Sequence, residues 1–187
     1  MKITPRLFMY LVFLLGVFGV QGCAPFKSSY APLLPAVAAE PLTAQQQWQV
    51  TLGDNHYPLL AVVERDTLGY TLVLTNNFGV RLATVTSSGG APVVETHLRH
   101  PLNAQWLRLV QTFQWAFWPP EALVQQNGIV FEQTSANERI FSSGIVRAKV
   151  NYPSDQHEAP IWQSWQGQAH ITTAEFSLFI QSVVVTY

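Results

Sequence analysis

Segments in which apolar and polar residues alternate follow one another through much of this chain, and this pattern constrains the fold most. In the first half they cover Trp48–Gly53, Leu59–Arg65, Tyr70–Thr75, Arg81–Thr86 and Pro92–His97. They are rich in Val, Leu, Thr and Tyr, and Gly, Asp or Asn residues separate them at short intervals. Period-2 segments joined by turn residues predict a meander of antiparallel hairpins.

The period changes to that of a helix after this first series. Apolar residues at 106, 109, 110, 113 and 117, with Arg108 and Thr112 on the other side, predict a helix from Leu102 to Trp118. Two prolines follow and end this helix, because proline lacks the backbone N–H that a helix interior needs. A second short helix is predicted over Glu121–Gln126.

Strand-like segments resume after the helices. They cover Ile129–Gln133, Arg139–Phe141, Ile145–Tyr152 and Ile161–Trp165, and Ala169–Tyr187 is predicted as two strands or one strand bent by a bulge. Pro41–Gln47 is predicted as a short helix or turn. Strands, then helices, then strands again predict an α+β domain in which an antiparallel sheet curls around helices.

The first 22 residues have the pattern of a secretory signal. An apolar or glycine run of 14 residues, Leu7–Val20, is shorter than the roughly 20 residues that cross a bilayer, and it has the length of a signal-peptide core. Gly22 and Cys23 then resemble the lipobox of bacterial lipoproteins, although Gln21 departs from the motif's preference for a small or weakly apolar residue. That resemblance implies cleavage before Cys23 and a diacylglyceryl group on its thiol. The alternatives are an ordinary secretory signal with a chance cysteine, and a buried free thiol.

Processing at this point predicts three segments: a lipoprotein signal peptide (1–22), a lipidated tether (23–40) and a single domain (41–187). The tether contains three prolines and no periodicity, as linkers do. Cys23 is the only cysteine. Once it is acylated, no thiol remains for a disulfide, so the apolar core must hold the domain together.

Charged residues are few, at 11% of the chain against about 25% in an average domain. Removal of Lys2 and Arg6 with the signal leaves eight basic and eleven acidic residues. We therefore expect no nucleic-acid partner, because nucleic-acid binding depends on clustered positive charge. Membrane attachment is expected to come from acyl chains instead.

Residues for catalysis or metal binding do not form a known motif. Of five histidines only His97 and His100 are close, and three residues apart at a strand end they do not converge on one ion. The chain has no Gly-x-Ser-x-Gly elbow, no glycine-rich phosphate loop and no His-Glu-x-x-His. We expect no enzyme, no metal and no cofactor. A carboxylate pair brought together by folding stays open.

Aromatic residues are concentrated in the predicted long helix, with five of them within thirteen positions. Aromatic side chains bury large areas, so they form either an ordinary core or the wall of a dry cavity for an apolar ligand, and the sequence leaves both open. The candidate cavity residues are Trp106, Leu109, Phe113, Phe117 and Trp118. Phe78 lies in a predicted turn, where it either folds back onto the sheet or forms an apolar tip that contacts a bilayer or a protein.

Two motifs carry a resemblance to known families over roughly residues 45–187. Tyr70-Thr-Leu-Val-Leu-Thr-Asn-Asn-Phe-Gly79 resembles a segment of LolB, the outer-membrane lipoprotein receptor. Gln114-Trp-Ala-Phe-Trp118-Pro119-Pro-Glu-Ala-Leu123 resembles the helix end of a family of uncharacterised bacterial lipoproteins associated with aryl-polyene or fatty-acid-like biosynthesis clusters.

The resemblance implies the LolA/LolB-like fold, an incomplete antiparallel barrel of about 9–11 strands wrapped around a helical lid. It places Phe78 where LolB-type receptors have a protruding apolar residue that contacts the membrane. Tryptophans at 115 and 118 are not a LolB feature, so flat conjugated or aryl-tailed lipids suit this helix at least as well as lipoprotein acyl chains.

The leading hypothesis is a lipoprotein anchored to the periplasmic face of the outer membrane that binds a hydrophobic, acyl-like cargo and transfers it to the membrane. Its expected partners are that lipid-like ligand, the outer membrane through the acylated cysteine, and a periplasmic carrier protein. The second hypothesis is a scaffold lipoprotein that docks a biosynthetic or export partner through surface aromatics such as Phe78, Trp162 or Trp165. The third is an enzyme, such as a thioesterase, that acts on the same cargo.

Overall fold

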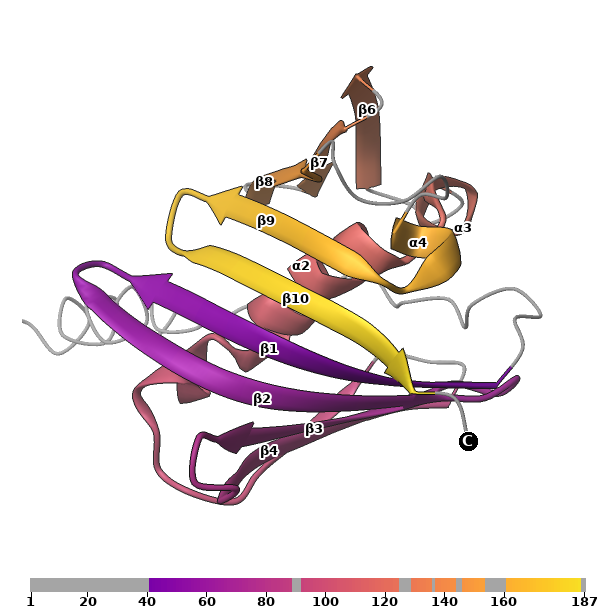
Figure 1. Cartoon of the computed structure of the whole chain (residues 1–187). Helices are drawn as coiled ribbons and strands as arrows, with labels where there is room; N and C mark the ends of the chain where they lie inside the picture. Colours follow the sequence, from indigo (N-terminus) through magenta and orange to yellow (C-terminus); the bar gives the residue numbers. More distant parts are fainter. Residues whose placement is uncertain are drawn as a thin grey trace, which may run out of the picture.

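The computed structural model describes residues 41–88, 92–124, 129–135, 137–143, 146–153 and 161–185. The predicted signal peptide, Cys23 and the tether lie outside the described residues, so they stay predictions. Within these ranges most residues belong to β-strands, and all the strands pair into one sheet (Figure 1).

The first half of the chain forms a meander, as its alternating segments predict. The strands are β1 (Leu42–Leu52), β2 (Asn55–Arg65), β3 (Tyr70–Asn76), β4 (Arg81–Ser87) and β5 (Val93–Thr96). Each strand pairs with the next in antiparallel register, because short turns join them.

A helical segment and a second meander follow. The helical part contains η1 (Pro101–Ala104), α2 (Trp106–Phe117) and α3 (Pro120–Val124). The remaining elements are β6 (Ile129–Ser135), β7 (Glu138–Ser143), β8 (Val146–Asn151), α4 (Ile161–Ser164), β9 (Gly167–Thr173) and β10 (Ser177–Val185). The last predicted segment is therefore two strands, the first of its two alternatives.

One pairing joins the two meanders. β1 and β10 run antiparallel from Thr43↔Val185 to Thr51↔Ser177, which gives a ten-stranded sheet in the order β5-β4-β3-β2-β1-β10-β9-β8-β7-β6. β5 and β6 are the edges, and no ladder between described residues joins them. The predicted α+β class with an open antiparallel sheet is confirmed.

The prediction of a short helix or turn at Pro41–Gln47 is wrong, because most of this segment belongs to β1. Ala44 and Gln46 are buried while Gln45 and Gln47 are exposed, which is the alternation of a strand. Gln46 hides this pattern in the sequence, since it is a polar residue on the buried face.

The prediction of a strand at Ile161–Trp165 is also wrong. Ile161–Ser164 is the helical turn α4, and the backbone N–H of Trp165 donates to the carbonyl of Ile161 over 2.7 Å. Trp165 has a φ of +57°, the left-handed conformation that commonly ends a helix. Glycine is the usual residue for this role, so a tryptophan gives no sequence signal of it.

Helix α2 lies on the concave side of the curved sheet (Figure 1). Every residue from Leu109 to Phe117 is buried, which is more than two consecutive turns. A helix on a flat sheet keeps one side exposed, so burial on all sides requires the sheet and other elements to surround it. Elements β8, β9 and α4 all contact α2.

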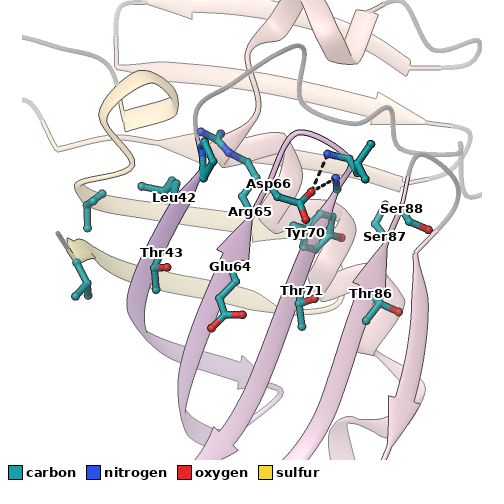
Figure 2. A pocket seen from close by; sticks show the side chains of 15 residues that line it. Leu42, Thr43, Glu64, Arg65, Asp66, Tyr70, Thr71, Thr86, Ser87 and Ser88 are labelled. Carbon is teal, nitrogen blue, oxygen red and sulfur yellow. Dashed lines mark hydrogen bonds between the residues drawn. The ribbon is translucent and has the colours of Figure 1, made fainter. Parts of the chain in front are cut away.

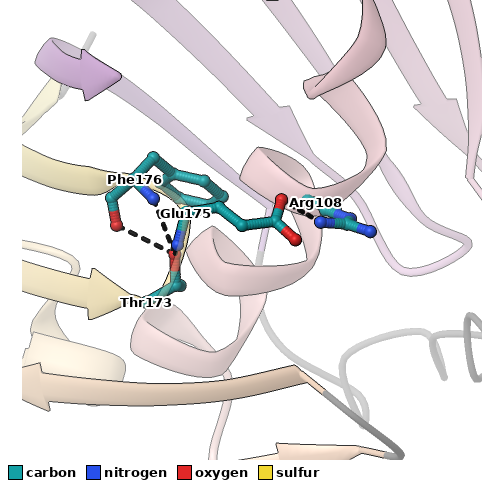
Figure 3. Close-up of polar contacts among 4 residues, drawn as sticks. All are labelled: Arg108, Thr173, Glu175 and Phe176. Carbon is teal, nitrogen blue, oxygen red and sulfur yellow. Dashed lines mark hydrogen bonds and ion pairs between the residues drawn. The ribbon is translucent and has the colours of Figure 1, made fainter. Parts of the chain in front are cut away.

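The exposed start of α2 is tied to the β9–β10 turn (Figure 3). Arg108 forms an ion pair with Glu175 in that turn. Thr173 Oγ1 accepts from the N–H of Phe176 over 3.0 Å and donates to its carbonyl over 2.9 Å, which fixes the turn. A half-exposed pair of this kind contributes little stability, but it orients the helix.

Gly69 in the β2–β3 turn offers a test of this packing. A Cβ at Gly69 would lie 1.6 Å from the backbone oxygen of Ser87. We expect Gly69→Ala to destabilise the domain by about 3 kcal/mol in urea unfolding, because the backbone itself must move. Gly53→Ala is the control: φ is +59° there and nothing lies within 4 Å, so it should cost about 1 kcal/mol. Equal losses would contradict the packing at the turn.

Candidate functional site

Six aromatic residues form a cluster in the centre of the concave face. We call them the aromatic cluster: Trp48, Tyr70, Phe113, Phe117, Trp118 and Trp165. Phe113 is its hub, because its ring centroid lies 5.3 Å from Trp48, 5.1 Å from Phe117 and 5.6 Å from Trp118. Trp165 lies 5.3 Å from Phe117 and 5.4 Å from Trp118. All six side chains are buried.

The five predicted cavity residues are all buried, but they divide into two groups. Phe113, Phe117 and Trp118 belong to the aromatic cluster. Trp106 lies at the other end of α2, where it donates from Nε1 to Asn103 Oδ1 over 3.1 Å and stacks on His100. Leu109 is also buried, and its position in α2 lies between those of Trp106 and Phe113. In this structure all five side chains are core, and their opening to a ligand stays a prediction.

Trp165 is the member of the cluster whose place in the core was not predicted from the sequence. The scaffold hypothesis treats it as a surface aromatic, but it is 1% exposed, so that assignment is wrong. Trp162, named with it, has a side chain outside the described part of the chain. The Trp165 backbone is in the left-handed region, which costs a non-glycine residue about 1–2 kcal/mol.

A chain of buried hydrogen bonds holds Trp165 in place. Trp48 Nε1 donates to Gln46 Oε1 over 2.8 Å, and Gln46 Nε2 donates to Ser182 Oγ over 3.0 Å. Ser182 Oγ then donates to the carbonyl of Trp165 over 2.7 Å. Strands β1 and β10 thus fix the backbone that presents the Trp165 ring.

A cavity of about 790 Å³ opens where several strands of the first meander end (Figure 2). We call it the rim cavity. Its lining comes from one end of the neighbouring strands β4, β3, β2, β1 and β10: Pro41–Thr43, Glu64–Asp66, Leu68–Thr71, Thr86–Ser88, Val184 and Val185. Its volume lies within the range of small-molecule sites. None of the five predicted cavity residues lines it.

The rim cavity borders the aromatic cluster, because Tyr70 belongs to both. The Arg65 guanidinium lies over the Trp165 ring, 4.8 Å from its centroid. The Tyr70 ring meets Trp118 edge-on at 5.3 Å, and its hydroxyl accepts from Gln114 Nε2 over 2.7 Å. Arg65 and Tyr70 both line the cavity, and each of them contacts a tryptophan of the cluster that does not line it.

The lining is amphipathic. Burial lowers the pKa of the Arg65 guanidinium below its ordinary value, but an arginine stays cationic at neutral pH. Leu42, Leu68 and the two valines supply apolar surface. Asp66 Oδ1 accepts from the N–H groups of Leu68 and Gly69 over 2.7 and 2.8 Å, so that oxygen serves the turn (Figure 2).

A second arginine borders the cluster, and unlike Arg65 it is fully buried. Arg139 on β7 lies over the rings of Phe131 and Tyr152 and donates from Nη1 to the carbonyl of Trp118 over 3.5 Å. Burial lowers its pKa, and Tyr152 and Glu121 act in the opposite direction. Sequence reasoning missed Arg139, because a lone arginine in a strand is usually solvated.

Phe78 is 90% exposed in the turn between β3 and β4. Asn76 Oδ1 accepts from the N–H groups of Phe78 and Val80, both over 3.0 Å, and Gly79 has a φ of +76°. The alternative in which Phe78 folds back onto the sheet is therefore wrong. Its contact with a membrane stays a prediction.

Across the described residues, no three His, Cys, Asp or Glu side chains gather as a metal site would require. No helix within those ranges is long and apolar enough to cross a membrane.

The comparison with known families assigns the chain. The model of a family described as "Protein of unknown function (DUF3261)" matches residues 43–184, which is most of the chain. The protein belongs to the DUF3261 family. No curated protein matches it. The DUF3261 match contains the sheet, the aromatic cluster and most of the rim-cavity lining.

The hydrogen bonds of Ser182 generate one prediction. Ser182→Ala removes an acceptor from Gln46 and a donor from the Trp165 carbonyl, which leaves two buried polar groups unpaired. We expect a loss of about 3 kcal/mol in urea unfolding followed by tryptophan fluorescence. Ser177→Ala on the same strand is the control, and it should stay within about 0.5 kcal/mol of the parent. A neutral Ser182→Ala would rule out the chain of bonds.

Two buried tyrosines generate a prediction of pH dependence. Burial raises the pKa of Tyr70 and of Tyr152 above the ordinary value of 10.0, so the folded protein keeps both protonated where the unfolded chain ionises them. The contribution of these two tyrosines to folding stability should therefore be constant below pH 9 and fall as the pH rises above 10, by up to about 2.7 kcal/mol per pH unit. Urea unfolding at several pH values measures this slope. Tyr70→Phe should halve it, and an unchanged slope would contradict the assignment.

Proposed function

We propose that this DUF3261 protein is an outer-membrane-anchored periplasmic lipoprotein that binds a hydrophobic, acyl-like molecule and transfers it to the membrane. The proposal includes the LolA/LolB-like form of the fold, in which an incomplete barrel holds a lipid chain. The proposal covers three classes of cargo: a lipid, an aryl polyene, or the acyl chains of a lipoprotein. No covalent chemistry is part of the proposal.

The rim cavity carries the proposal. It is large enough for part of an amphiphile, and its lining offers both a cation and apolar surface. An acidic head fits the Arg65 guanidinium, because charge-assisted hydrogen bonds are strong where water is partly excluded. An apolar tail fits against Leu42, Leu68 and Tyr70.

The contact between the cavity lining and the aromatic cluster supports a path for the rest of the tail. Arg65 and Tyr70 line the cavity and contact the Trp165 and Trp118 rings, respectively. Movement of these two side chains would let a chain meet the aromatic cluster without unfolding the sheet. Rings that pack in tilted and edge-on pairs also pack well against flat conjugated chains.

The anchor supplies the membrane side of the transfer. Acylated Cys23 would keep the domain at the bilayer, so a weak affinity for the cargo suffices for repeated exchange. Transfer then requires only that the cargo binds to the cavity of the DUF3261 domain about as favourably as it partitions into the bilayer.

One observation favours the scaffold as a second candidate. Phe78 is held almost fully exposed by a turn with satisfied backbone groups, which is costly for a residue that has no contact to make. A scaffold would dock a biosynthetic or export partner there and would leave the rim cavity without cargo.

Uptake of a fluorescent fatty acid distinguishes the two candidates. A chain beginning at Ala24, without the acyl anchor, is titrated with an anthroyloxy fatty acid, and energy transfer from tryptophan reports binding. We expect saturable binding at one site, weakened about tenfold by Arg65→Ala because the head loses its charged partner. Arg81→Ala, an exposed arginine on β4, is the control and should bind like the parent.

Mass spectrometry of the protein isolated from its own envelope identifies the native cargo. A hydrophobic ligand that co-purifies and that Arg65→Ala loses supports the carrier. Absence of any uptake, together with a protein captured through Phe78 and lost on Phe78→Ala, supports the scaffold and contradicts the carrier.

A further inference from the structure

Two apolar turn residues are held in solvent at opposite ends of β3. Leu68 in the β2–β3 turn is 72% exposed, and Phe78 in the β3–β4 turn is 90% exposed. They are the two most exposed large apolar side chains among the described residues. Each turn has an Asx hydrogen-bond pattern that holds its apolar tip outward, from Asp66 and from Asn76 respectively.

The sheet register places Leu68 beside the start of the domain. Leu42 pairs with Arg65, and Arg65 pairs with Tyr70, so the first residues of β1 and the β2–β3 turn share one end of the sheet. Phe78 comes after Asn76, the last residue of β3, which is six residues beyond Tyr70 at the start of the strand. At about 3.3 Å per residue this separates the two tips by roughly 20 Å or more. In Figure 1, β1 starts and β2 ends at one end of the strands, and the β3–β4 turn lies at the opposite end.

The point where the chain enters β1 favours one end of the sheet for contact with the membrane. Cys23 and Pro41 are 18 residues apart. A segment of this length spans at most about 60 Å, and a random coil of this length averages about 25 Å. The chain from Cys23 enters the domain at the end that carries Leu68, so this end is nearer to the point of attachment than Phe78 is, by about one strand length.

The chemistry of this end suits an apolar contact. Pro41, Leu42, Leu68, Val184 and Val185 are the aliphatic residues in the lining of the rim cavity. The backbone N–H groups of Leu68 and Gly69 already donate to Asp66, so the tip enters an interface without exposing unpaired donors. The charged side chains beside it, Glu64, Arg65 and Asp66, give no net positive charge, so attraction to anionic lipids does not drive the contact.

We infer that the Leu68 tip, rather than Phe78, is the surface through which the domain touches the lipid bilayer, with the mouth of the rim cavity facing the membrane. The inference rests on the proposed function in one respect, the acylated Cys23. It assigns a direction to transfer, because cargo would leave the rim cavity directly into lipid. A single leucine suffices as the contact, since the anchor holds the tip at high local concentration.

Single-cysteine labelling of the full lipoprotein tests the orientation. Acylation blocks the thiol of the only native cysteine, so an added cysteine is the sole reactive thiol. Leu68→Cys and Phe78→Cys are labelled with a nitrobenzoxadiazole fluorophore and reconstituted in phosphatidylethanolamine–phosphatidylglycerol vesicles. We expect nitroxide lipids to quench the label at 68 and aqueous iodide to quench the label at 78. Raising the salt concentration should leave this difference unchanged, because the contact is apolar.

Neighbouring exposed positions guard against a local effect of either label. Thr67→Cys should behave as position 68 does, and Asn77→Cys should behave as position 78 does. Lipid quenching at the Phe78 end, at both ends or at neither end overturns the inference, as does an intact mass without the acyl group. None of these readouts uses a cargo. Failure of fatty-acid uptake would therefore contradict the carrier alone, and a misplaced label would contradict the orientation alone.

Discussion

Burial of α2 on every side is the constraint on which the rest of the structure depends. Leu109–Phe117 presents no polar face to water, so the helix is stable only inside a sheet that curves around it. The β1–β10 pairing makes that curvature possible, because it joins two hairpin meanders into one continuous surface. The aromatic cluster then fills the space between helix and sheet, and the rim cavity lies where the strands run past it.

Backbone strain and a chain of buried hydrogen bonds meet where this packing is anchored. Trp165 adopts the left-handed backbone that ends α4, and its carbonyl receives the hydrogen bond of Ser182. Gln46 and Ser182 are polar residues on the buried face of the sheet, and each has a partner. Buried polar groups that are fully paired fix one arrangement of a core more firmly than apolar contacts alone. The position of the Trp165 ring, and of Arg65 over it, is therefore well defined.

The sequence predicted the strands and the long helix because each has a period that survives in its residues. The sequence-based prediction was wrong where a single residue broke the periodic pattern because of a contact or a backbone conformation that only the folded structure shows. Gln46 hid the start of β1, since its partner Ser182 is 136 residues away. Trp165 hid the end of α4, since it takes a conformation expected of glycine. The aromatic residues of α2 were found from their number, but the rim cavity was not. Its lining comes from turns and strand ends that only the pairing of the strands brings together.

A core filled by aromatic rings is compatible with transport of an apolar chain. Tilted and edge-on rings hold one another mainly by dispersion, and an inserted chain offers similar contacts in return. In the proposed carrier this exchange would have to be close to neutral in free energy, because a cavity that binds its cargo too tightly does not release it. Specificity in such an exchange falls to the few groups that are not interchangeable with hydrocarbon. At the rim cavity that group is Arg65, the cation that lies over Trp165 at the entrance to the cluster.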